Sequence, residues 1–502
     1  MTTSLWRGTT NPTGCPMLVE DIQTDIAIVG GGIAGVSLAW RLVQAGRSVV
    51  LLEANALGVG DTGNSTGNLY ATVSSGLRAI RQKWGDDVVR QVAQSRGEAV
   101  DWIEEHVHRL GIDCAFRRCP LVRYPASADA RDGIEAEFEA SLAAGLAIRR
   151  EGVLPPGLPH AHGDALVLEQ QAQFHPLAYV LALARHAADN GCRIFERSPV
   201  VEIDRSQQLL RTERGSVKAQ HIVLATHSPS GFHLMQAGMV PHREYGLAAP
   251  LNGDSFPAGI FYAEGSERLS VRGLDTTQGN YLVCVGQTAK TGQHDAAAAM
   301  ARLEESARLR LGIRQIAFRW SAQNFPSPDG LPYIGKDAFG CYVATGFATD
   351  GLTYGTLAAA IIADRILGAD NRWSELYRAT RLTAVKSAKG TAEEVVSMGK
   401  ALIQDYLTRR QHEQLQSLAP GSAAIAELEG ERVAAYRDPA GRLFAVSPVC
   451  THMKCIVHWN AVEASWDCPC HGSRFAPDGS VLSGPALAPL TIKLVPDQES
   501  GT

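Results

Sequence analysis

No stretch of this sequence suggests a membrane-spanning helix, because no window of 18 residues is both uncharged and apolar throughout. Long basic runs are also missing, and the formal net charge is −5. This charge balance argues against nucleic acid and against an anionic membrane surface as partners. The N-terminal residues lack a charged segment followed by an apolar one, so we expect no secretory signal and a cytoplasmic location.

Cysteine is sparse, with ten in 502 residues, which excludes a small fold stapled by disulfides. Otherwise the composition, 45% apolar and 20% charged, is that of a globular protein of about three domains. Four of the cysteines lie close together near the C-terminus, between 450 and 470. The other six show no pairing pattern and are expected to stay reduced: Cys15, Cys114, Cys119, Cys192, Cys284 and Cys341.

Two short C-terminal segments each offer one cysteine and one histidine as metal ligands. The first reads Cys450-Thr-His452-Met-Lys-Cys455, and the second reads Cys468-Pro-Cys470-His471-Gly-Ser473. Two thiolates and two imidazoles suit a tetrahedral zinc site, and they equally suit a [2Fe–2S] centre in which two histidines replace two cysteines on one iron. The ligands in both cases are Cys450, His452, Cys468 and His471.

A glycine-rich segment near the N-terminus lies between a strand pattern and a helix pattern. The apolar run Thr24–Val29 precedes Gly30-Gly-Gly32-Ile-Ala-Gly35, and Glu53 ends the next strand pattern 18 positions later. In this context Gly30 permits a tight turn, Gly32 lets the backbone approach a pyrophosphate, and Gly35 lets the helix pack on the strand. Glu53 can accept hydrogen bonds from ribose hydroxyls. The segment therefore predicts a dinucleotide site.

A second glycine pattern, Gly58-Val-Gly60-Asp-Thr-Gly63, follows without a strand and helix of its own, so we interpret it as a loop. The sequence thus shows one dinucleotide site. A flavoprotein that takes hydride from a nicotinamide usually carries a second nucleotide-binding unit, so an organic substrate is the expected reductant.

From Asp25 to about Gly368 the sequence resembles the glycine oxidase and D-amino-acid oxidase family of FAD-dependent oxidoreductases. The resemblance rests on the fingerprint, on the loop ending at Gly67, on His175-Pro176, on the strand before Thr226-His227, and on two segments, Pro328–Gly335 and Val343–Gly355. It implies that FAD is bound by a set of residues spread over these motifs: Gly30, Gly32, Ile33, Ala34, Gly35, Glu53, Gly63, Ser65, Thr66, Gly67, Val201, Gly346, Asp350, Gly351, Leu352 and Thr353.

The C-terminal strings CTHxxC and CPCHGS resemble a Rieske [2Fe–2S] domain of the cytochrome bc type. This resemblance implies that the four ligands above bind the cluster and that Cys455 and Cys470 form a disulfide. The order of the two parts is similar to that of a subfamily of FAD proteins fused to a C-terminal Rieske domain.

The expected fold is an α/β FAD-binding domain of the Rossmann type, an α+β substrate domain with an antiparallel sheet, and a small all-β Rieske domain. An irregular arm, 1–20, is expected to precede an oxidoreductase part, 21–370. Within it, about 21–75, 165–235 and 325–370 would bind FAD, and about 75–165 and 235–325 would form the substrate domain. A helical connector, 371–420, with a capping-box signal at Thr391 and Glu394, is expected before the Rieske domain, 421–502.

Two positions depart from the patterns that the resemblance implies. The fused subfamily carries Gly-Gly-Glu-Asp-His before Lys-Thr-Gly, whereas this chain reads Gly286-Gln287-Thr288-Ala289 there, without the acidic residue and the histidine. In the Rieske part Phe475 stands where the bc-type motif has a tyrosine.

Substrate is expected to meet the flavin between the two larger domains. Arg272, Tyr245 and Tyr354 are the candidate catalytic residues. Other residues that could reach the substrate or position a loop near it are Arg243, Tyr262, His227 and His175.

These features predict a dehydrogenase that oxidises a small amine or amino acid and passes electrons from FAD through the cluster to a one-electron acceptor, either a protein or a quinone. Two alternatives remain open. One is an oxidase that uses oxygen and carries an accessory Rieske domain, and the other is an electron-transfer protein without an organic substrate.

Overall fold

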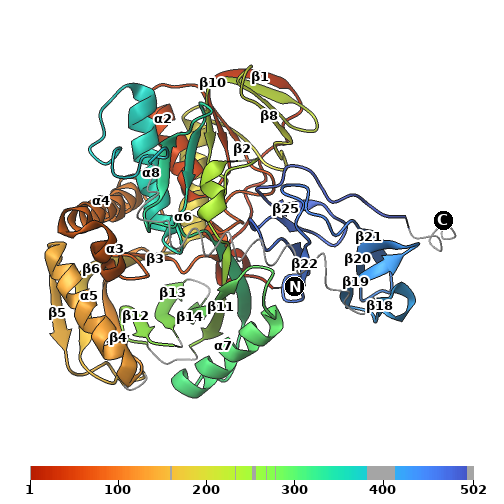
Figure 1. Cartoon of the computed structure of the whole chain (residues 1–502). Coiled ribbons are helices and arrows are strands. Elements are labelled where there is room, and N and C mark those ends of the chain that lie inside the picture. The colour runs from red at the N-terminus through yellow and green to blue at the C-terminus, as the bar shows by residue number, and fades with distance from the viewer. Residues whose placement is uncertain are drawn as a thin grey trace.

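The computed structural model describes residues 2–158, 161–231, 233–251, 256–266, 268–276, 279–381 and 413–494. Figure 1 shows one α/β part at the top, a second sheet with its helices below, and the C-terminal domain to the right. The expected fold class, a Rossmann-type part, an antiparallel-sheet part and an all-β C-terminal domain, is confirmed.

The first sheet is mostly parallel and carries the glycine-rich turn. Its strand order is β16-β17-β10-β1-β2-β7, and β8 and β9 extend it beside β10. The strand β2 and the C-terminal ends of β1 and β10 are short apolar runs that are buried on both faces, as expected for a parallel sheet covered by helices. The bounds are β1 (Asp21–Val29), β2 (Val49–Leu52), β7 (Arg193–Phe195), β8 (Glu202–Asp204), β9 (Leu209–Arg211), β10 (Ser216–Leu224), β16 (Tyr333–Lys336), β17 (Tyr342–Thr345), α2 (Ile33–Gln44), α6 (Pro176–Asp189) and α8 (Gly351–Leu367).

The second sheet is mostly antiparallel, with the order β15-β11-β14-β13-β12-β4-β6-β3 and with β5 beside β6. One face of it packs on α7, and the other faces the cofactor-binding part. The bounds are β3 (Asn68–Leu69), β4 (Arg117–Pro125), β5 (Ile148–Glu151), β6 (Ala165–Gln173), β11 (His242–Pro250), β12 (Ile260–Glu264), β13 (Leu269–Thr276), β14 (Gly279–Lys290), β15 (Phe318–Asn324), α3 (Leu77–Trp84), α4 (Asp86–Leu110), α5 (Arg131–Ala143) and α7 (Ala296–Leu311).

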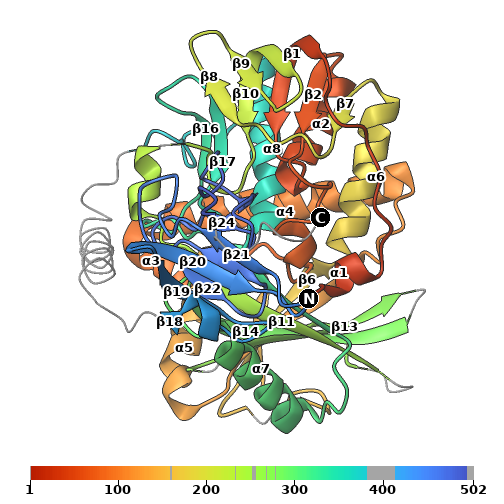
Figure 2. The same cartoon turned by 90° about the vertical axis from the view of Figure 1, so that its right-hand side faces the viewer.

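The C-terminal domain consists of two small sheets, β18-β19-β20-β21 and β22-β23-β24-β25. Figure 2 shows it lying across the junction between the two larger parts. The bounds are β18 (Glu413–Gln414), β19 (Ala423–Leu428), β20 (Glu431–Arg437), β21 (Leu443–Val446), β22 (His458–Asn460), β23 (Ser465–Asp467), β24 (Arg474–Phe475) and β25 (Val481–Ser483).

The structure moves two of the expected boundaries and replaces one expected helical segment by turns. Residues 165–173 form β6 of the second sheet, so the cofactor-binding part resumes only at α6. The C-terminal domain begins by 413, because β18 pairs with β19. Trp373–Tyr377 forms turns instead of a helix, and the helix expected at 391–407 lies outside the described residues.

The N-terminal arm is not irregular throughout, as the sequence suggested. Its helix α1 (Leu5–Gly8) is capped by the hydroxyl of Ser4, and Leu5 and Trp6 are fully buried. The indole nitrogen of Trp6 donates to the carbonyl of Ser65, 2.7 Å away. The arm therefore supports the loop that was expected to bind FAD.

Candidate functional site: a dinucleotide-binding turn and a cysteine–histidine cluster

The glycine-rich turn has the geometry that its sequence predicts. Gly30 has φ +109°, and a Cβ there would lie 2.4 Å from the carbonyl oxygen of Ala225. A Cβ on Gly35 would lie 1.9 Å from the carbonyl oxygen of Gly30, so only glycine lets α2 start this close to β1. The first turn of α2 contains no acidic residue, which leaves its N-terminus free to bind an anionic pyrophosphate.

Glu53 closes the dinucleotide site from the end of β2. Its carboxylate accepts hydrogen bonds from the amides of Gly31 and Asn55, at 2.8 and 2.9 Å. Burial raises the pKa of Glu53. A hydroxyl pair of a ribose would find an acceptor at this position, as expected for FAD.

The loop after β2 reaches back to the start of α2. The hydroxyl of Thr62 accepts a hydrogen bond from the amide of Ile33 at 3.1 Å. Farther along the loop, Arg272 donates to the carbonyl of Thr66 at 2.8 Å and to that of Phe174 at 3.2 Å. Arg272 thus supports the loop that contains Gly63, Ser65, Thr66 and Gly67 from beneath.

Helix α8 brings a second helix N-terminus to the same place. A Cβ on Gly355 would lie 3.0 Å from Ile33 and 3.4 Å from Ala34, so the first turns of α2 and α8 touch. Gly346 (φ +76°) precedes the helix, and Gly351, Leu352 and Thr353 form its first turn. Two adjacent helix N-termini suit the phosphates and the carbonyl edge of a bound FAD.

Two residues of the expected cofactor set, Asp350 and Val201, make contacts within the protein itself. The carboxylate of Asp350 pairs with Arg96 at 3.0 Å and accepts from the amide and hydroxyl of Ser74, so it braces the start of α8. Val201 is 39% exposed and its amide donates to the carbonyl of Arg211, whereas the preceding Val200 is buried among the ends of β1 and β2. The side chain of Val200 therefore faces these strand ends and that of Val201 points to the other side, and the assignment of Val201 to the cofactor stays a prediction.

The three candidate catalytic residues do not meet in the structure. Tyr245 packs on the α7 face of the second sheet, where its hydroxyl lies 2.6 Å from Nε2 of His294. Tyr354 is enclosed between helices, with its ring beneath the guanidinium of Arg96 and beside Tyr377, and burial raises its pKa to about 12. Both predictions were wrong about placement, because strand alternation and helix packing turn these side chains away from the cleft.

Arg272 alone of the three lies on the face that turns toward the cofactor loops. It is 1% exposed, and burial lowers its pKa to about 9. Its Nη1 atom has no hydrogen-bond partner among the described residues. This side chain positions the Thr66–Gly67 loop, and a bound cofactor could satisfy the remaining nitrogen.

His175 and His227 both contact residues of the protein that hold loops or helix ends in place. His175 caps α6 by accepting from the amide of Ala178, as expected for a helix start. His227 lies 2.7 Å from the carboxylate of Asp61 and stacks edge-on against Phe325. Asp61 was not identified from the sequence, although it adjoins Thr62 of the cofactor loop.

The four expected cluster ligands converge at one end of the C-terminal domain. The rings of His452 and His471 lie 5.1 Å apart, and Nδ1 of His471 is buried without a partner among the described residues. A hydrogen bond from Cys468 lowers the pKa of the Cys450 thiol to about 6, and the same bond raises that of Cys468. Two thiols within hydrogen-bond distance of each other, an imidazole nitrogen without a partner among the described residues and a second imidazole fit a [2Fe–2S] centre with mixed ligands.

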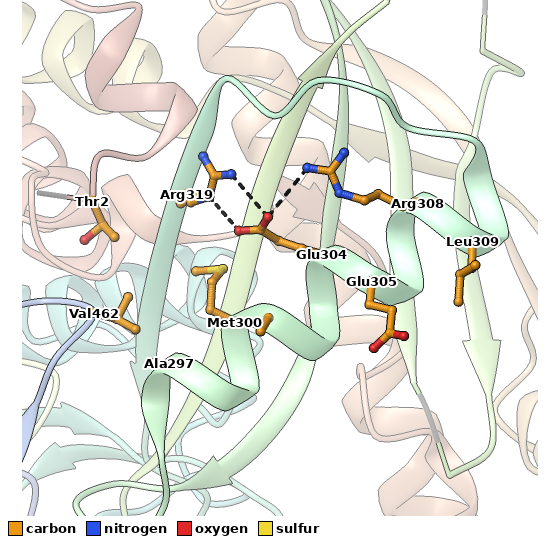
Figure 3. Close-up of a pocket in the computed structure, with 10 residues that line it drawn as sticks. Thr2, Ala297, Met300, Glu304, Glu305, Arg308, Leu309, Arg319 and Val462 are labelled. Atoms are coloured by element: carbon orange, nitrogen blue, oxygen red, sulfur yellow. Dashed lines mark hydrogen bonds and ion pairs between the residues drawn. The ribbon is translucent and has the colours of Figure 1, made fainter.

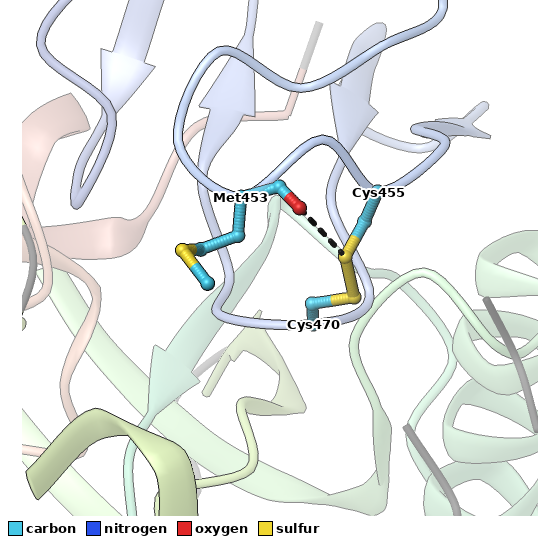
Figure 4. The surroundings of a disulfide bond; sticks show 3 residues. All are labelled: Met453, Cys455 and Cys470. Atoms are coloured by element: carbon cyan, nitrogen blue, oxygen red, sulfur yellow. Dashed lines mark hydrogen bonds between the residues drawn. A yellow bond between two sulfur atoms is a disulfide. The ribbon is translucent and has the colours of Figure 1, made fainter. Parts of the chain in front are cut away.

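The two spare cysteines are bonded to each other, as expected. Sγ of Cys455 lies 2.00 Å from Sγ of Cys470, next to the carbonyl of Met453 (Figure 4). These two sulfurs and that of Cys468 lie within 4.8 Å of one another. Because the disulfide sulfurs cannot serve as thiolate ligands, the bond ties the two ligand loops together beside the metal site.

The C-terminal domain docks on the larger parts through a buried charge network. Arg243, 1% exposed, pairs with Glu463 at 2.9 Å, and Glu463 also binds Arg474 at 2.6 Å. The hydroxyl of Ser321 donates to the same carboxylate. Arg243 therefore joins two domains and is not available to a substrate.

The ligand loops themselves contact both larger parts. Nε2 of Gln323 donates to the carbonyl of Gly472 at 2.8 Å, and the amide of Gln323 donates to Asp61 at 3.0 Å. Nε2 of His452 lies 3.2 Å from the carbonyl of Gly231. One residue, Gln323, thus connects the loop of His471 to the loop that caps α2.

A surface hollow of about 620 Å³ lies elsewhere, between α7, the N-terminal arm and the turn at Val462 (Figure 3). Three of its charged residues pair with one another, because Glu304 lies 2.6 Å from Arg319 and 3.8 Å from Arg308. The hollow is on the α7 face of the sheet, and none of the residues that line it belongs to the loops expected to bind FAD.

Within the described residues, no helix combines the length and the apolar character that crossing a bilayer requires.

Comparison with known proteins agrees with this division of the chain. Residues 25–365 match the family described as FAD dependent oxidoreductase, and residues 410–496 match the Rieske [2Fe-2S] domain. The Rieske 2Fe-2S iron-sulfur protein YhfW of Bacillus subtilis (strain 168) is 31% identical over 97% of this chain and 96% of its own.

Two further relatives are more distant. Gamma-glutamylputrescine oxidoreductase of Escherichia coli (strain K12) is 29% identical over 43% of this chain and 51% of its own length. The crystal structure of glycine oxidase from Geobacillus kaustophilus superimposes with a TM-score of 0.61 and 21% identity, covering 72% of this chain and 99% of that one, which shows a common fold. The chain thus belongs to the FAD-dependent oxidoreductase family and carries a C-terminal Rieske [2Fe–2S] domain, so FAD and a [2Fe–2S] cluster are its cofactors.

Proposed function

We propose that this oxidoreductase removes two electrons from the C–N unit of a small amine or amino acid and delivers them singly, through its cluster, to an external acceptor. When bound, FAD supplies the oxidising group, which accepts the hydrogen of the C–H bond next to nitrogen as hydride. The substrate nitrogen loses a proton, the resulting imine is hydrolysed by water, and two one-electron acceptors are reduced in turn.

The observation that supports this proposal most directly is the bridge at Gln323. Its amide binds Asp61, beside the residue that caps α2, and its side chain binds Gly472, next to the expected ligand His471. Gln323 is 5% exposed. Gly472 (φ +74°) packs so closely against it that a Cβ on Gly472 would lie 2.7 Å from Nε2 of Gln323. Such contact keeps the flavin and cluster ends of the molecule at a fixed separation.

The relatives agree with this choice of chemistry. Two of them, glycine oxidase and gamma-glutamylputrescine oxidoreductase, are named for compounds that contain a carbon–nitrogen bond. Within this chain the residues divide the work: α2 and α8 bind the dinucleotide, Arg272 positions its loop, and the histidine–cysteine loops bind the cluster.

The test is anaerobic reduction of the flavin by a panel of amines and amino acids, followed by absorbance. Some panel members should bleach the wild-type flavin, and then reduce the cluster. In a Cys450→Ser, Cys468→Ser variant, substrate should still bleach the flavin in one turnover, while turnover with an acceptor that takes electrons from the cluster should be lost.

Two results would overturn the proposal. If the variant consumed oxygen at the wild-type rate and wild type made peroxide stoichiometrically, the protein would be an oxidase with an accessory cluster. If no panel member bleached the flavin, an electron-transfer protein without an organic substrate would be the better explanation.

A further inference from the structure

Helix α8 begins at an aspartate that does not cap it. Asp350 occupies the N-cap position, where an aspartate side chain ordinarily accepts a hydrogen bond from the second or third amide of the helix. Here the carboxylate makes no capping bond to α8. The amides of Gly351, Leu352 and Thr353 therefore receive no side-chain partner from the N-cap residue, at the helix end that is expected to face FAD.

Two other parts of the chain hold this carboxylate away from the helix. Nη2 of Arg96 lies 3.0 Å from Oδ1 of Asp350. The amide of Ser74 donates to both carboxylate oxygens, at 3.1 and 3.2 Å, and the hydroxyl of Ser74 donates to Oδ2 at 2.9 Å. Both oxygens of Asp350 are therefore occupied by partners that lie outside α8.

The guanidinium of Arg96 is itself fixed in place. Its Nε donates to the carbonyl of Thr72 at 2.6 Å, and its Nη2 donates to that of Tyr70 at 3.1 Å. The group also lies 4.4 Å from the ring centre of Tyr354, in the first turns of α8. Arg96 is fully buried, and although burial lowers its pKa, the charge of Asp350 raises that pKa above its ordinary value. Asp350 thus has a rigid cationic partner that stays charged.

The charge of Asp350 matters because of the helix end beside it. The N-terminus of α8 carries the positive end of a helix dipole, which favours a negative group near the first turn. A flavin gains negative charge on its carbonyl edge when it takes up two electrons, so open amides at a positive helix end stabilise its reduced form. An uncompensated buried carboxylate, one residue before those amides, would oppose this stabilisation.

We propose that Arg96 is a positioning residue for the flavin. By pairing with Asp350 it keeps the first amides of α8 open and offsets the negative charge beside them, so that this helix end can stabilise the reduced cofactor. The inference rests on the binding of FAD at α8, which the proposed function also requires. It does not depend on which substrate reduces the flavin.

Three charge variants test the proposal on the protein with FAD bound. Arg96→Met leaves the carboxylate alone, Asp350→Asn leaves the guanidinium alone, and the double variant removes both charges. The control is Arg118→Met, because Arg118 is 23% exposed and pairs at 2.6 Å with Glu104 of α4, the helix that also contains Arg96.

Two measurements report the electrostatics without any amine. One is the reduction potential of the flavin, and the other is the Kd of sulfite, which adds to the flavin ring and leaves a negative charge on the same edge. Arg96→Met should lower the potential by the equivalent of about tenfold or more in the equilibrium constant of reduction, about 30 mV for two electrons. It should also weaken sulfite binding.

Asp350→Asn should shift both quantities in the opposite direction, because it leaves a buried positive charge beside the helix end. The double variant should return close to wild type, and Arg118→Met should not differ from it. Opposite signs with mutual rescue distinguish an electrostatic role from a merely structural one, since loss of a structural brace by either change would disturb the site in the same sense.

Shifts of the same sign in the two single variants would overturn the inference, and so would potentials and sulfite affinities that match wild type in both. If Arg96→Met does not retain FAD, Asp350→Asn decides alone, and an unchanged or lowered potential there overturns it. The proposed function is judged separately, because only the amine panel tests it: a panel without any reducing amine would remove that function and leave the role of Arg96 standing.

Discussion

The ion pair between Arg243 and Glu463 offers the sharpest test of how the Rieske domain is attached. Nη2 of Arg243 lies 2.9 Å from the carboxylate of Glu463, and the side chains are 1% and 15% exposed. Although burial raises the pKa of Glu463, Arg243 and Arg474 lower it to about 2, from an ordinary value of 4.5. A shift of that size corresponds to roughly 3 kcal/mol in favour of the ionised carboxylate. Arg474 belongs to the same domain as Glu463, so only the part that Arg243 and Ser321 contribute favours the docked state.

The two halves of the pair should respond unequally to substitution. Glu463→Ala leaves Arg243 buried with Ser321 as its neutral partner, so domain docking should weaken by about 3–5 kcal/mol. Arg243→Met leaves Glu463 paired with Arg474 at 2.6 Å, so the loss should be smaller, about 1–3 kcal/mol. The double variant should lose less than the sum, because it strands neither charge.

Hydrogen exchange measures the docking directly. Amides of β11 and of the turn around Glu463 should exchange faster in both variants, and the exchange rates give the free energy of local opening. Arg442→Gln is the control, because Arg442 is 69% exposed and pairs with Asp438 at 3.4 Å on the surface, so it should change stability by less than about 0.5 kcal/mol.

The pH dependence follows from the lowered pKa of Glu463. A carboxyl group whose pKa falls on docking contributes its full stabilisation above about pH 4.5, and that contribution is lost as the pH falls toward 2. Glu463→Gln should remove this part of the pH dependence, with cluster absorbance monitored at each pH. Unchanged exchange in Glu463→Ala, or strictly additive single and double variants, would refute the reasoning.

Two further predictions concern the cluster domain. Ser473 is fully buried, and its hydroxyl contributes to the lowered pKa of Cys450, so Ser473→Ala should lower the reduction potential of the cluster. Phe475→Tyr adds a second hydroxyl at a fully buried position and should raise that potential. Redox titration followed by electron paramagnetic resonance measures both changes. Gly472→Ala should push the second ligand loop away from Gln323 and slow electron transfer from flavin to cluster by at least tenfold, while the cluster spectrum stays unchanged. Gly441→Ala is the control, because Gly441 also has a positive φ, +90°, and nothing lies within 4 Å of the new Cβ, so the electron-transfer rate should not change.

Patterns of residues that are close together in the sequence predicted several features of this molecule. The close contact between Gly35 and Gly30 lies within one strand–turn–helix unit, so the glycine pattern identifies the turn without knowledge of the rest of the fold, although Gly30 also packs against Ala225 from another part of the chain. The same holds for the cluster ligands, because each loop brings a thiolate and an imidazole two or three residues apart, and two such loops supply the ligand set of one mixed-ligand centre. The disulfide between Cys455 and Cys470 followed from the resemblance, and the structure confirms it.

The side chains of the second sheet were harder to place. Whether Arg243, Tyr245 or Glu244 faces the flavin depends on the strand register, and a bulge beside Gln287 shifts that register locally. The sequence therefore determined the two cofactors, the order of the domains and the ligands of the cluster, since each depends on residues that are neighbours along the chain. Only the tertiary structure decided that Arg243 pairs with Glu463, that Trp6 supports the loop expected to bind FAD and that Gln323 connects this loop to Gly472 beside the expected cluster ligand His471, because each contact joins residues more than 50 positions apart.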